Sequence, residues 1–565
     1  MRSSLTVFCI VLLLSTSVPT SIPTNTVDVW FLGVESSNPS LGVAMKARVQ
    51  IRNSSSHRIS IHNVNFDRTV FYSFLLAGYA IKYVCGLDVD RILVDIHIND
   101  YKQVKGASAS LAYAMAVLKA LNKINVTGAQ WGASGITSID GFIDAVGGLH
   151  TKIRTAKEVG VETVYIPMIN GFRDNLNGEA TRVIRVASLA DLCWDRLSVN
   201  NISIEPSLEE FAVVNEFFEH RAIEFLYRIE DLVGRFPNDM RNSLAQLYRD
   251  LSINVSRALE KGHGYTAANY AFLGYIRLMR EYLELDTTVS DYLMKESEDA
   301  VKNALSVFNS FRYIRTSAIP LLVVILDRIA EAQFYINLYK NLTRAPVQSP
   351  QSILDTLTRA HARSLTIDIW LDLLRLVNSS LVSNGGDGQF VAFNRVYATA
   401  LNTLRAVSLT IEWSQELAPL SLSAIAATRG TLAKQLDNIS RSKVTNSLRE
   451  LYRIHSSHLD TNTRVIPYMY YIYAEDLQLD GSSDYINILS ISTLILAVTN
   501  IIRDALDRGD LVMYMEPNYV GIRPSYDIKT IALPLNIVVM LLLLVLLLHI
   551  VEKGFRPTYA TSKAI

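Results

Sequence analysis

Residues 92–121 read ILVDIHINDYKQVKGASASLAYAMAVLKAL, and this stretch decides the fold of the N-terminal part of the chain. Every second residue from Ile92 to Ile98 is Ile or Val, and Asp95 and His97 fall on the opposite face, which predicts a β-strand. A loop follows, and after Ser108 most side chains are Ala, Leu, Met or Val. A helix that is apolar nearly all round is a buried helix. The stretch therefore predicts a strand, a loop and a core helix that begins at a serine.

A serine at the start of a buried helix has a chemical use. The backbone N–H groups of the first helical turn have no partner within the helix, and the positive end of the helix dipole lies there. The backbone around Gly106, Ala107 and Ala109 could therefore stabilise an oxyanion that forms beside Ser108. A second interpretation is that these residues are small only to allow close packing. Taken alone, the stretch favours this structural interpretation.

A lysine further along the chain makes the catalytic interpretation of Ser108 stronger. Residues 145–167, AVGGLHTKIRTAKEVGVETVYIP, predict a glycine turn, a helix and a short strand. Lys152 falls on the apolar face of that helix, together with Leu149, Ile153 and Ala156. Burial favours a neutral amine, which can accept a proton from a serine, and Ser–Lys pairs are known in serine hydrolases. The alternative is that Lys152 extends its ammonium group to water.

Taken together, the two segments resemble the proteolytic domain of the Lon family (S16) of serine peptidases. In that family the nucleophile begins a buried helix after a loop of the form Lys-Asp-Gly-Pro-Ser-Ala-Gly, and KGASAS places Ser108 at that position. The family then has Thr-Gly-Glu-Ile-Thr and, later, Gly-Gly-Leu-x-x-Lys. SGITSIDGFIDAVGGLHTK, residues 134–152, matches this order and places Lys152 at the base. The resemblance covers about residues 27–197 and implies an α+β, Lon-type proteolytic domain.

The sequence departs from the family pattern at several positions. Lys105–Ala107 lack the acidic residue and the proline, and Ile136 replaces a glutamate. Ser134 replaces a threonine that can hold the lysine amine, a role that its hydroxyl could keep. Ser110 replaces a glycine and is a rival nucleophile, although its helix position directs it elsewhere. These changes put the substrate preference in doubt and, to a lesser degree, the activity itself.

Other chemistries have no support in the sequence. The chain has no Gly-x-x-x-x-Gly-Lys-Ser/Thr loop for ATP, no His-Glu-x-x-His and no spaced Cys/His cluster, so no cofactor or metal is expected. Lys plus Arg and Asp plus Glu both total 54, and this balance predicts no field that would attract nucleic acid. Without a motor, a Lon-like site should accept unfolded chains or peptides. The resemblance also implies a ring of six subunits.

A second region, residues 206–510, predicts an all-helical domain, either a bundle or a helical-repeat array. Its first segment begins with the capping-box pattern Ser207-x-x-Glu210, and apolar residues then recur every three or four positions. Further helices are predicted near 238–261, 265–285, 288–310, 317–342, 351–380, 391–417, 421–455 and 484–508.

The two ends of the chain predict export and anchoring. Residues 1–25 have the layout of a signal peptide, and the uncharged segment 531–551 has the length of one transmembrane helix. Lys and Arg in the tail, 552–565, favour a cytoplasmic tail and an extracytoplasmic main body at the cell membrane. Export would allow a disulfide between Cys85 and Cys193, and two buried thiols fit the sequence equally well.

Two functions remain open from the sequence. The first is a membrane-anchored, ATP-independent serine endopeptidase that uses Ser108 and Lys152. The second is a cell-surface binding or scaffold protein that keeps a Lon-like fold without catalysis. The missing acidic residues favour the second, whereas an inward-facing lysine, which costs stability, favours the first.

Overall fold

The computed structural model describes residues 25–35, 38, 40–55, 58–62, 65–98, 103–104, 106–171, 181–193, 203–344, 349–380, 389–410 and 421–508. Of the predicted signal peptide, only Asn25 is among these residues, where it begins the first strand. The predicted transmembrane helix at 531–551 and the tail at 552–565 lie outside the described residues.

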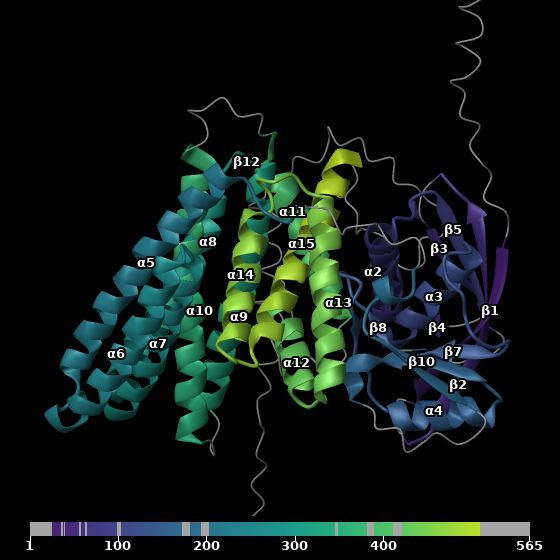
Figure 1. Ribbon diagram of the computed structural model, residues 1–565, viewed down its shortest axis with the longest axis horizontal. Helices are drawn as coiled ribbons and strands as arrows, with labels where there is room; N and C mark the ends of the chain where they lie inside the picture. Colours follow the sequence, from purple (N-terminus) through teal and green to yellow (C-terminus); the bar gives the residue numbers. More distant parts are fainter. Residues whose placement is uncertain are drawn as a thin grey trace, which may run out of the picture. The chain divides into compact units, whose positions relative to one another are not determined.

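A seven-stranded mixed sheet forms the N-terminal part of the chain (Figure 1). Its strand order is β11-β10-β7-β1-β2-β5-β3. β2 pairs antiparallel with β1 and β5, and the remaining pairings are parallel. The strands are β1 (Asn25–Val34), β2 (Gly42–Asn53), β3 (Arg58–His62), β5 (Ile92–Ile98), β7 (Trp131–Ala133), β10 (Thr163–Pro167) and β11 (Arg182–Val186). The strands predicted around 92–98 and 163–167 are confirmed.

Helices cover both faces of this sheet. α2 (Arg68–Cys85) and α3 (Ser110–Ala120) share an apolar cluster with Val29 and Phe31 of β1. α4 (Leu149–Glu158) lies in a second cluster with Leu32, whose side chain points to the opposite face. The buried helix predicted after Ser108 is confirmed as α3, whereas α2 is missing from the sequence prediction. Its start has a local signal, because Asp67 caps the helix by accepting a hydrogen bond from the Val70 N–H (3.1 Å).

The region after residue 206 is largely helical. Its helices are α5 (Leu208–Arg235), α6 (Asn238–Glu260), α7 (Gly264–Leu285), α8 (Ser290–Phe308), α9 (Ile319–Arg344), α10 (Pro350–Ser380), α11 (Phe393–Leu409), α12 (Leu422–Lys434), α13 (Asn438–Ser457), α14 (Val465–Leu479) and α15 (Tyr485–Arg508).

The helical region differs from its prediction in three respects. It is not all-helical, because β12 (Tyr313–Arg315) and β13 (Phe390–Ala392) pair as a small antiparallel sheet. The single helix predicted at 421–455 is two helices, since Asp437 caps α13 by accepting a hydrogen bond from the Ser440 N–H (2.9 Å). α14 is absent from the sequence prediction.

The two regions share one hydrophobic core. Leu448 and Leu451 of α13 and Leu489 of α15 belong to the same buried cluster as Phe74 of α2 and Leu111 of α3. In Figure 1, α13 lies next to the sheet region, and α11 and α15 also contact α2. The helical region therefore completes the core on one side of the sheet.

Among the described residues, α15 is the one helix long and apolar enough to cross a membrane. Most of it is buried inside the protein, where it packs against α12, α13 and α14. A core helix satisfies the same criteria of length and composition, so α15 is weak support for a membrane span.

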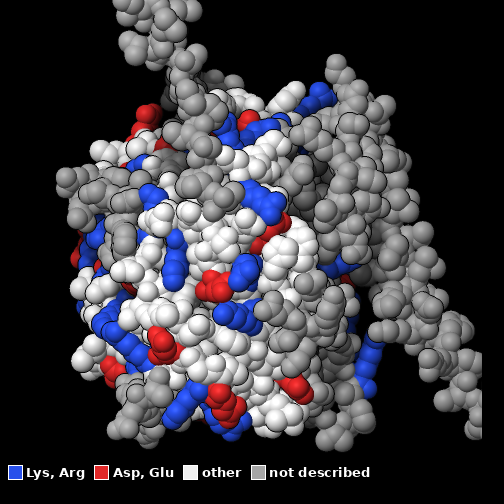
Figure 2. All heavy atoms as spheres, turned by 90° about the vertical axis from the view of Figure 1, so that its right-hand side faces the viewer, with Lys and Arg blue, Asp and Glu red and all other residues white. Residues whose placement is uncertain are grey.

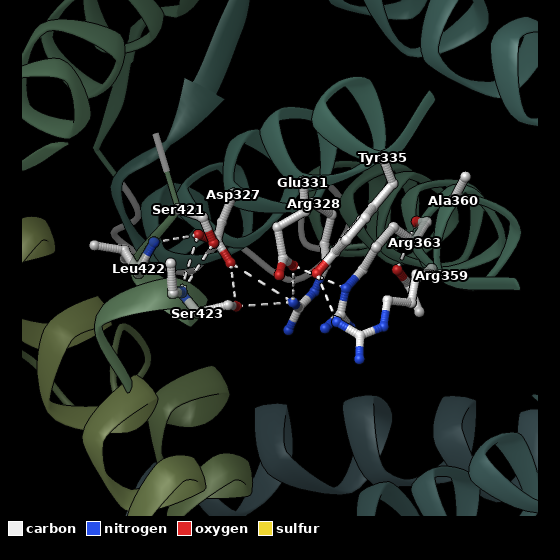
Figure 3. A network of polar contacts seen from close by, with 12 residues as sticks. Asp327, Arg328, Glu331, Tyr335, Arg359, Ala360, Arg363, Ser421, Leu422 and Ser423 are labelled. Carbon is white, nitrogen blue, oxygen red and sulfur yellow. Dashed lines mark hydrogen bonds and ion pairs between the residues drawn. The ribbon is translucent and has the colours of Figure 1, made fainter. Parts of the chain in front are cut away.

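A buried polar network joins α9, α10 and α12 (Figure 3). Asp327 of α9 accepts hydrogen bonds from the Leu422 N–H (2.5 Å) and from Ser423 Oγ (2.7 Å), so it caps α12 from another helix. Glu331 of α9 pairs with Arg328 (2.6 Å) and with Arg363 of α10 (2.9 Å). This network fixes the N-terminal end of α12.

Further along α12, Arg429 joins the helical region to the sheet region. Its guanidinium donates to both carboxylate oxygens of Asp140 (2.7 and 3.0 Å) and of Asp144 (2.7 and 3.0 Å), and it lies over the Phe142 ring. Arg429 and Asp140 are almost fully buried. The sequence predicts Asp140 and Asp144 as loop carboxylates at a solvated or subunit surface. That expectation is wrong for Asp140, which is fully buried, and the Asp144 carboxylate is bound by the same guanidinium rather than by water alone.

The junction favours the charged form of Asp140 over that of Asp144, whose pKa is raised by burial and by the neighbouring Asp140. Burial alone would raise the pKa of Asp140, but Arg429 outweighs burial and holds the pKa below its ordinary value. Thr493 of α15 donates a further hydrogen bond to Asp140 (3.0 Å), and His455 Nε2 lies 3.0 Å from the Asp140 carbonyl oxygen. Three helices of the second region therefore contact this one aspartate.

The surface of the sheet region carries both signs of charge. Figure 2 shows basic and acidic side chains interspersed among uncharged ones on the face that forms the right-hand side of Figure 1. Asp28 of β1, for example, pairs with Arg48 (3.1 Å) and Lys46 (3.5 Å) of β2. Pairs of this exposed kind contribute little stability, in contrast to the buried junction.

Cys85, at the end of α2, and Cys193 form a disulfide with a Cα–Cα distance of 5.8 Å. The sequence left this pairing open.

We expect the Cys85→Ser/Cys193→Ser variant of the full-length chain to lose about 2–5 kcal/mol of unfolding free energy, since the bond closes a loop of about 108 residues. Urea unfolding with and without reductant would measure this. Reductant should destabilise the unmodified chain and leave the variant unchanged.

Removal of the junction guanidinium should destabilise the protein strongly. Arg429→Met leaves Asp140 buried without its cation, and loss of one partner of a buried pair costs about 3–5 kcal/mol. Arg503→Met is the matched control, because its pair with Asp460 is partly exposed and should contribute at most about 1 kcal/mol. Equal losses for the two variants in urea unfolding would contradict the assignment of Arg429 as the principal link.

Mild acid should also destabilise the protein. Burial lowers the pKa of His455 from 6.5 to about 4, so between these values the unfolded chain binds a proton that the folded chain does not. The contribution of His455 to the unfolding free energy is complete above pH 6.5. It falls by up to about 1.4 kcal/mol per pH unit as the pH drops towards 4. In urea unfolding, His455→Asn should reduce this slope, whereas His220→Asn, at an exposed position on α5, should not.

Candidate active site

The structure places Ser108 in a short 3₁₀ turn, Ala107–Ala109, that leads directly into α3. Gly106 precedes the turn with φ +87°, a backbone conformation that favours glycine. The side chain of Ser108 is nearly buried, and its carbonyl oxygen accepts a hydrogen bond from the Gly135 N–H (2.9 Å). Of the predicted backbone residues, Ala107 and Ala109 belong to this turn and Gly106 directly precedes it. Lys105 lies outside the described residues.

Lys152 lies on the buried face of α4 with Leu149, Ile153 and Ala156, as the helical spacing predicts. Only 2% of Lys152 is exposed, so the alternative in which its ammonium extends to water is wrong. Its Nζ donates a hydrogen bond to Ser134 Oγ over 3.1 Å. The amine is therefore held inside the protein by a neutral hydroxyl.

Ser134 and Gly135 connect the two candidate catalytic residues. The Ser134 hydroxyl binds the Lys152 amine, and the next residue, Gly135, binds the backbone of Ser108 and of Leu111. Its N–H donates to the Ser108 carbonyl (2.9 Å), and its carbonyl accepts from the Leu111 N–H (3.1 Å). Because consecutive Cα atoms are about 3.8 Å apart, these bonds bring the turn of Ser108 and the tip of Lys152 to one place.

Gly135 is required for this close approach. A Cβ atom at residue 135 would lie 2.9 Å from Leu111 Cδ2 and 2.9 Å from Ile143 Cγ2. Any side chain would therefore separate the loop from α3. This glycine is part of the Lon-like motif in the sequence. The narrow space between the loop and α3 is the physical reason for a residue without a side chain at this position.

Ser110, the rival nucleophile, has a structural role. It is fully buried, and its Oγ donates to the Ala107 carbonyl (2.8 Å) and accepts from the Thr137 N–H (2.8 Å). Its hydroxyl thus holds the turn of Ser108 against β8 (Ile136–Thr137). The sequence-based expectation that Ser110 is directed away from the reaction agrees with these bonds.

Ile136, which replaces the glutamate of the family, makes the surroundings of the site apolar. It is 5% exposed and belongs to a cluster with Ala107, Leu149 and Ile153. β8 pairs antiparallel with β9 (Ile143–Asp144), so Ile136 lies opposite Asp144. The β8–β9 hairpin therefore extends from the site to the Arg429 junction.

Sequence reasoning missed Arg429, Thr493 and His455, which surround this hairpin. A buried arginine in an amphipathic helix is a signal for an acidic partner, because arginine is rarely fully buried without one. The sequence does not say which carboxylates provide it. Only the folded chain brings Asp140 and Asp144 to that guanidinium.

Comparison with known proteins agrees with the geometry. Residues 86–179 match the Lon protease (S16) C-terminal proteolytic domain, a segment that contains both Ser108 and Lys152. The chain is 39% identical over 93 residues to an archaeal Lon protease of Pyrococcus abyssi and 40% identical over 93 residues to that of Methanothermobacter thermautotrophicus. It is 26% identical over 162 residues to the archaeal Lon protease of Methanocaldococcus jannaschii.

These matches are confined to one part of the chain. The first two cover 16% of this chain and 9% and 14% of the relatives, and the third covers 27% of this chain and 25% of its relative. The helical region after residue 206 lies outside the matched domain segment. The N-terminal region is therefore similar to the Lon-like serine peptidases, with the matched domain between residues 86 and 179.

Proposed function

We propose that this chain is an ATP-independent serine endopeptidase that cleaves unfolded polypeptides by a Ser108–Lys152 dyad. The observation that carries the proposal is the buried Lys152 amine, which is bonded to Ser134 beside the turn of Ser108. Lys152 is buried, and a neutral amine at this position is a competent general base. The similarity to the Lon proteolytic domain supports the same two residues.

The proposed reaction has two halves. Ser108 Oγ attacks the peptide carbonyl carbon and transfers its proton to Lys152 Nζ, and the carbonyl oxygen becomes an oxyanion near the backbone of Gly106–Ala109. The C–N bond then breaks, and Lys152 returns the proton to the leaving amine. Water attacks the acyl-enzyme, Lys152 accepts its proton, and that proton returns to Ser108 as the acid product leaves.

Ser134 is a positioning residue in this scheme. Its hydroxyl can accept from a neutral or a protonated amine, so it can help to orient Lys152 through the cycle. The apolar side chain of Ile136 contributes a low-dielectric environment, which favours the neutral base between turnovers.

The proposed setting is the outer face of a membrane. The Cys85–Cys193 disulfide supports an oxidising compartment, and the sequence predicts a signal peptide and one transmembrane helix at 531–551. The sequence contains no P-loop, so we propose that substrates enter already unfolded. Assembly into a ring of six is proposed from the family resemblance alone.

We expect detergent-solubilised full-length chain to cleave unfolded casein. Ser108→Ala should abolish cleavage, and Lys152→Met should lower the rate by about 10²–10⁴-fold, the usual contribution of a general base. Lys157→Met is the matched control, because Lys157 lies on the exposed face of the same helix and should not matter. Gel assays and intact-mass spectra would measure cleavage, and circular dichroism would confirm folding.

The outcomes separate the two candidate functions. Full activity in Ser108→Ala or in Lys152→Met would exclude the dyad. If the unmodified chain cleaves nothing and a fluorophosphonate probe does not label Ser108, a non-catalytic binding or scaffold protein with a Lon-like fold is the better description.

A further inference from the structure

A small hollow lies where α12 meets the β8–β9 hairpin. Ile136 and Ala145 line it from the sheet region, and Ile425, Thr428 and Leu432 line it from α12. These three residues follow one another at intervals of three and four positions, so they share one face of the helix. The hollow therefore has one wall from each region of the chain.

The hollow begins beside the candidate dyad. Ile136 directly follows Gly135, which binds the backbone of Ser108, and lies two residues after Ser134, which binds Lys152. Ile136 also belongs to the same apolar cluster as Ala107, the residue before Ser108. A peptide whose carbonyl carbon reaches Ser108 would thus have side chains within reach of this hollow.

Among the described residues the lining is largely apolar, and its charged members, Asp144 and Arg429, are paired with each other. The Thr428 and Thr410 hydroxyls already donate to carbonyl oxygens of their own helices (2.9 and 2.7 Å). The guanidinium of Arg429 is occupied by the carboxylates of Asp140 and Asp144. A charged substrate side chain would lose its hydration here without a partner, whereas an aliphatic one would bury its surface against Ile136, Ile425 and Leu432.

The α12 wall is fixed in position. Asp327 of α9 caps its first turn, and Arg429 attaches the same helix to the hairpin that forms the opposite wall. A wall held at two points keeps its shape when the hollow is empty, which reduces the entropy lost on binding.

We propose that this hollow is a specificity subsite for an uncharged aliphatic side chain of the polypeptide substrate, and that α12 sets its size. The inference rests on the proposed peptidase function. It adds a determinant of substrate specificity that lies outside the Lon-like segment. Residues more than 240 positions after that segment would then decide which peptide bonds are cut.

The test uses full-length chain in detergent and a set of quenched fluorescent peptides that differ at one residue, Ala, Leu, Phe, Asp or Lys, at each position around the cut. At one position the unmodified chain should cleave the Leu peptide at least about tenfold faster in kcat/KM than the Asp or Lys peptide. Thr428→Trp, which fills the hollow, should lower the Leu-to-Ala ratio at that position about tenfold. Leu432→Ala, which enlarges it, should raise the ratio for Phe over Leu.

Leu479→Trp and Leu479→Ala are the matched controls, because Leu479 is 79% exposed at the end of α14, and both should keep the ratios of the unmodified chain. Unchanged ratios in both Thr428→Trp and Leu432→Ala, with cleavage retained, would overturn the subsite. Absence of cleavage and of Ser108 labelling in the unmodified chain would instead contradict the proposed function. Probe labelling of Ser108 in each variant separates loss of the subsite from loss of the dyad.

Discussion

The buried Arg429 fork is the interaction on which the arrangement of the two regions depends. One guanidinium satisfies two carboxylates of the sheet region, and Asp140 has no exposure to water. Ions removed from water are stable only in close, well-hydrogen-bonded geometry, so the fork allows little freedom between α12 and the β8–β9 hairpin. That hairpin is continuous with Ser134 and Gly135, which hold Lys152 and Ser108. The position of the helical region is therefore coupled to the position of the candidate dyad through only a few residues.

Much of the site could be predicted because its signals are local. The alternation in Ile92–Ile98, the apolar helix after Ser108 and the spacing that buries Lys152 are all set by neighbours within one or two turns. The Lon-like motifs also predict the order in which the strand, the serine loop, the apolar helix and the lysine helix follow one another. The buried position of Lys152 and its bond to Ser134 agree with what the sequence led us to expect.

The features that the sequence did not predict depend on contacts between distant parts of the chain. Asp140 and Asp144 look like solvated loop residues until Arg429 is placed beside them, and no pattern within 20 residues of either reveals it. The same holds for the contact of Asp327 with the first turn of α12, although the N-cap of that helix, Ser421, is local and accepts from the Ala424 N–H. The helix boundary at Asp437 could have been found, since an aspartate three residues before Ser440 is a recognisable cap. The small β12–β13 sheet could not, because its strands pair across more than 70 residues.

The common core of the two regions has an evolutionary consequence. Leu448, Leu451 and Leu489 cover apolar surface of α2 and α3 that would otherwise face water. A proteolytic domain built in this way cannot be transferred as an independent cassette, since a gene fragment that ended before the helices would encode an open, aggregation-prone half. Descendants of this chain are thus expected to retain or lose both regions together, and changes in the helices should accompany changes in the sheet region.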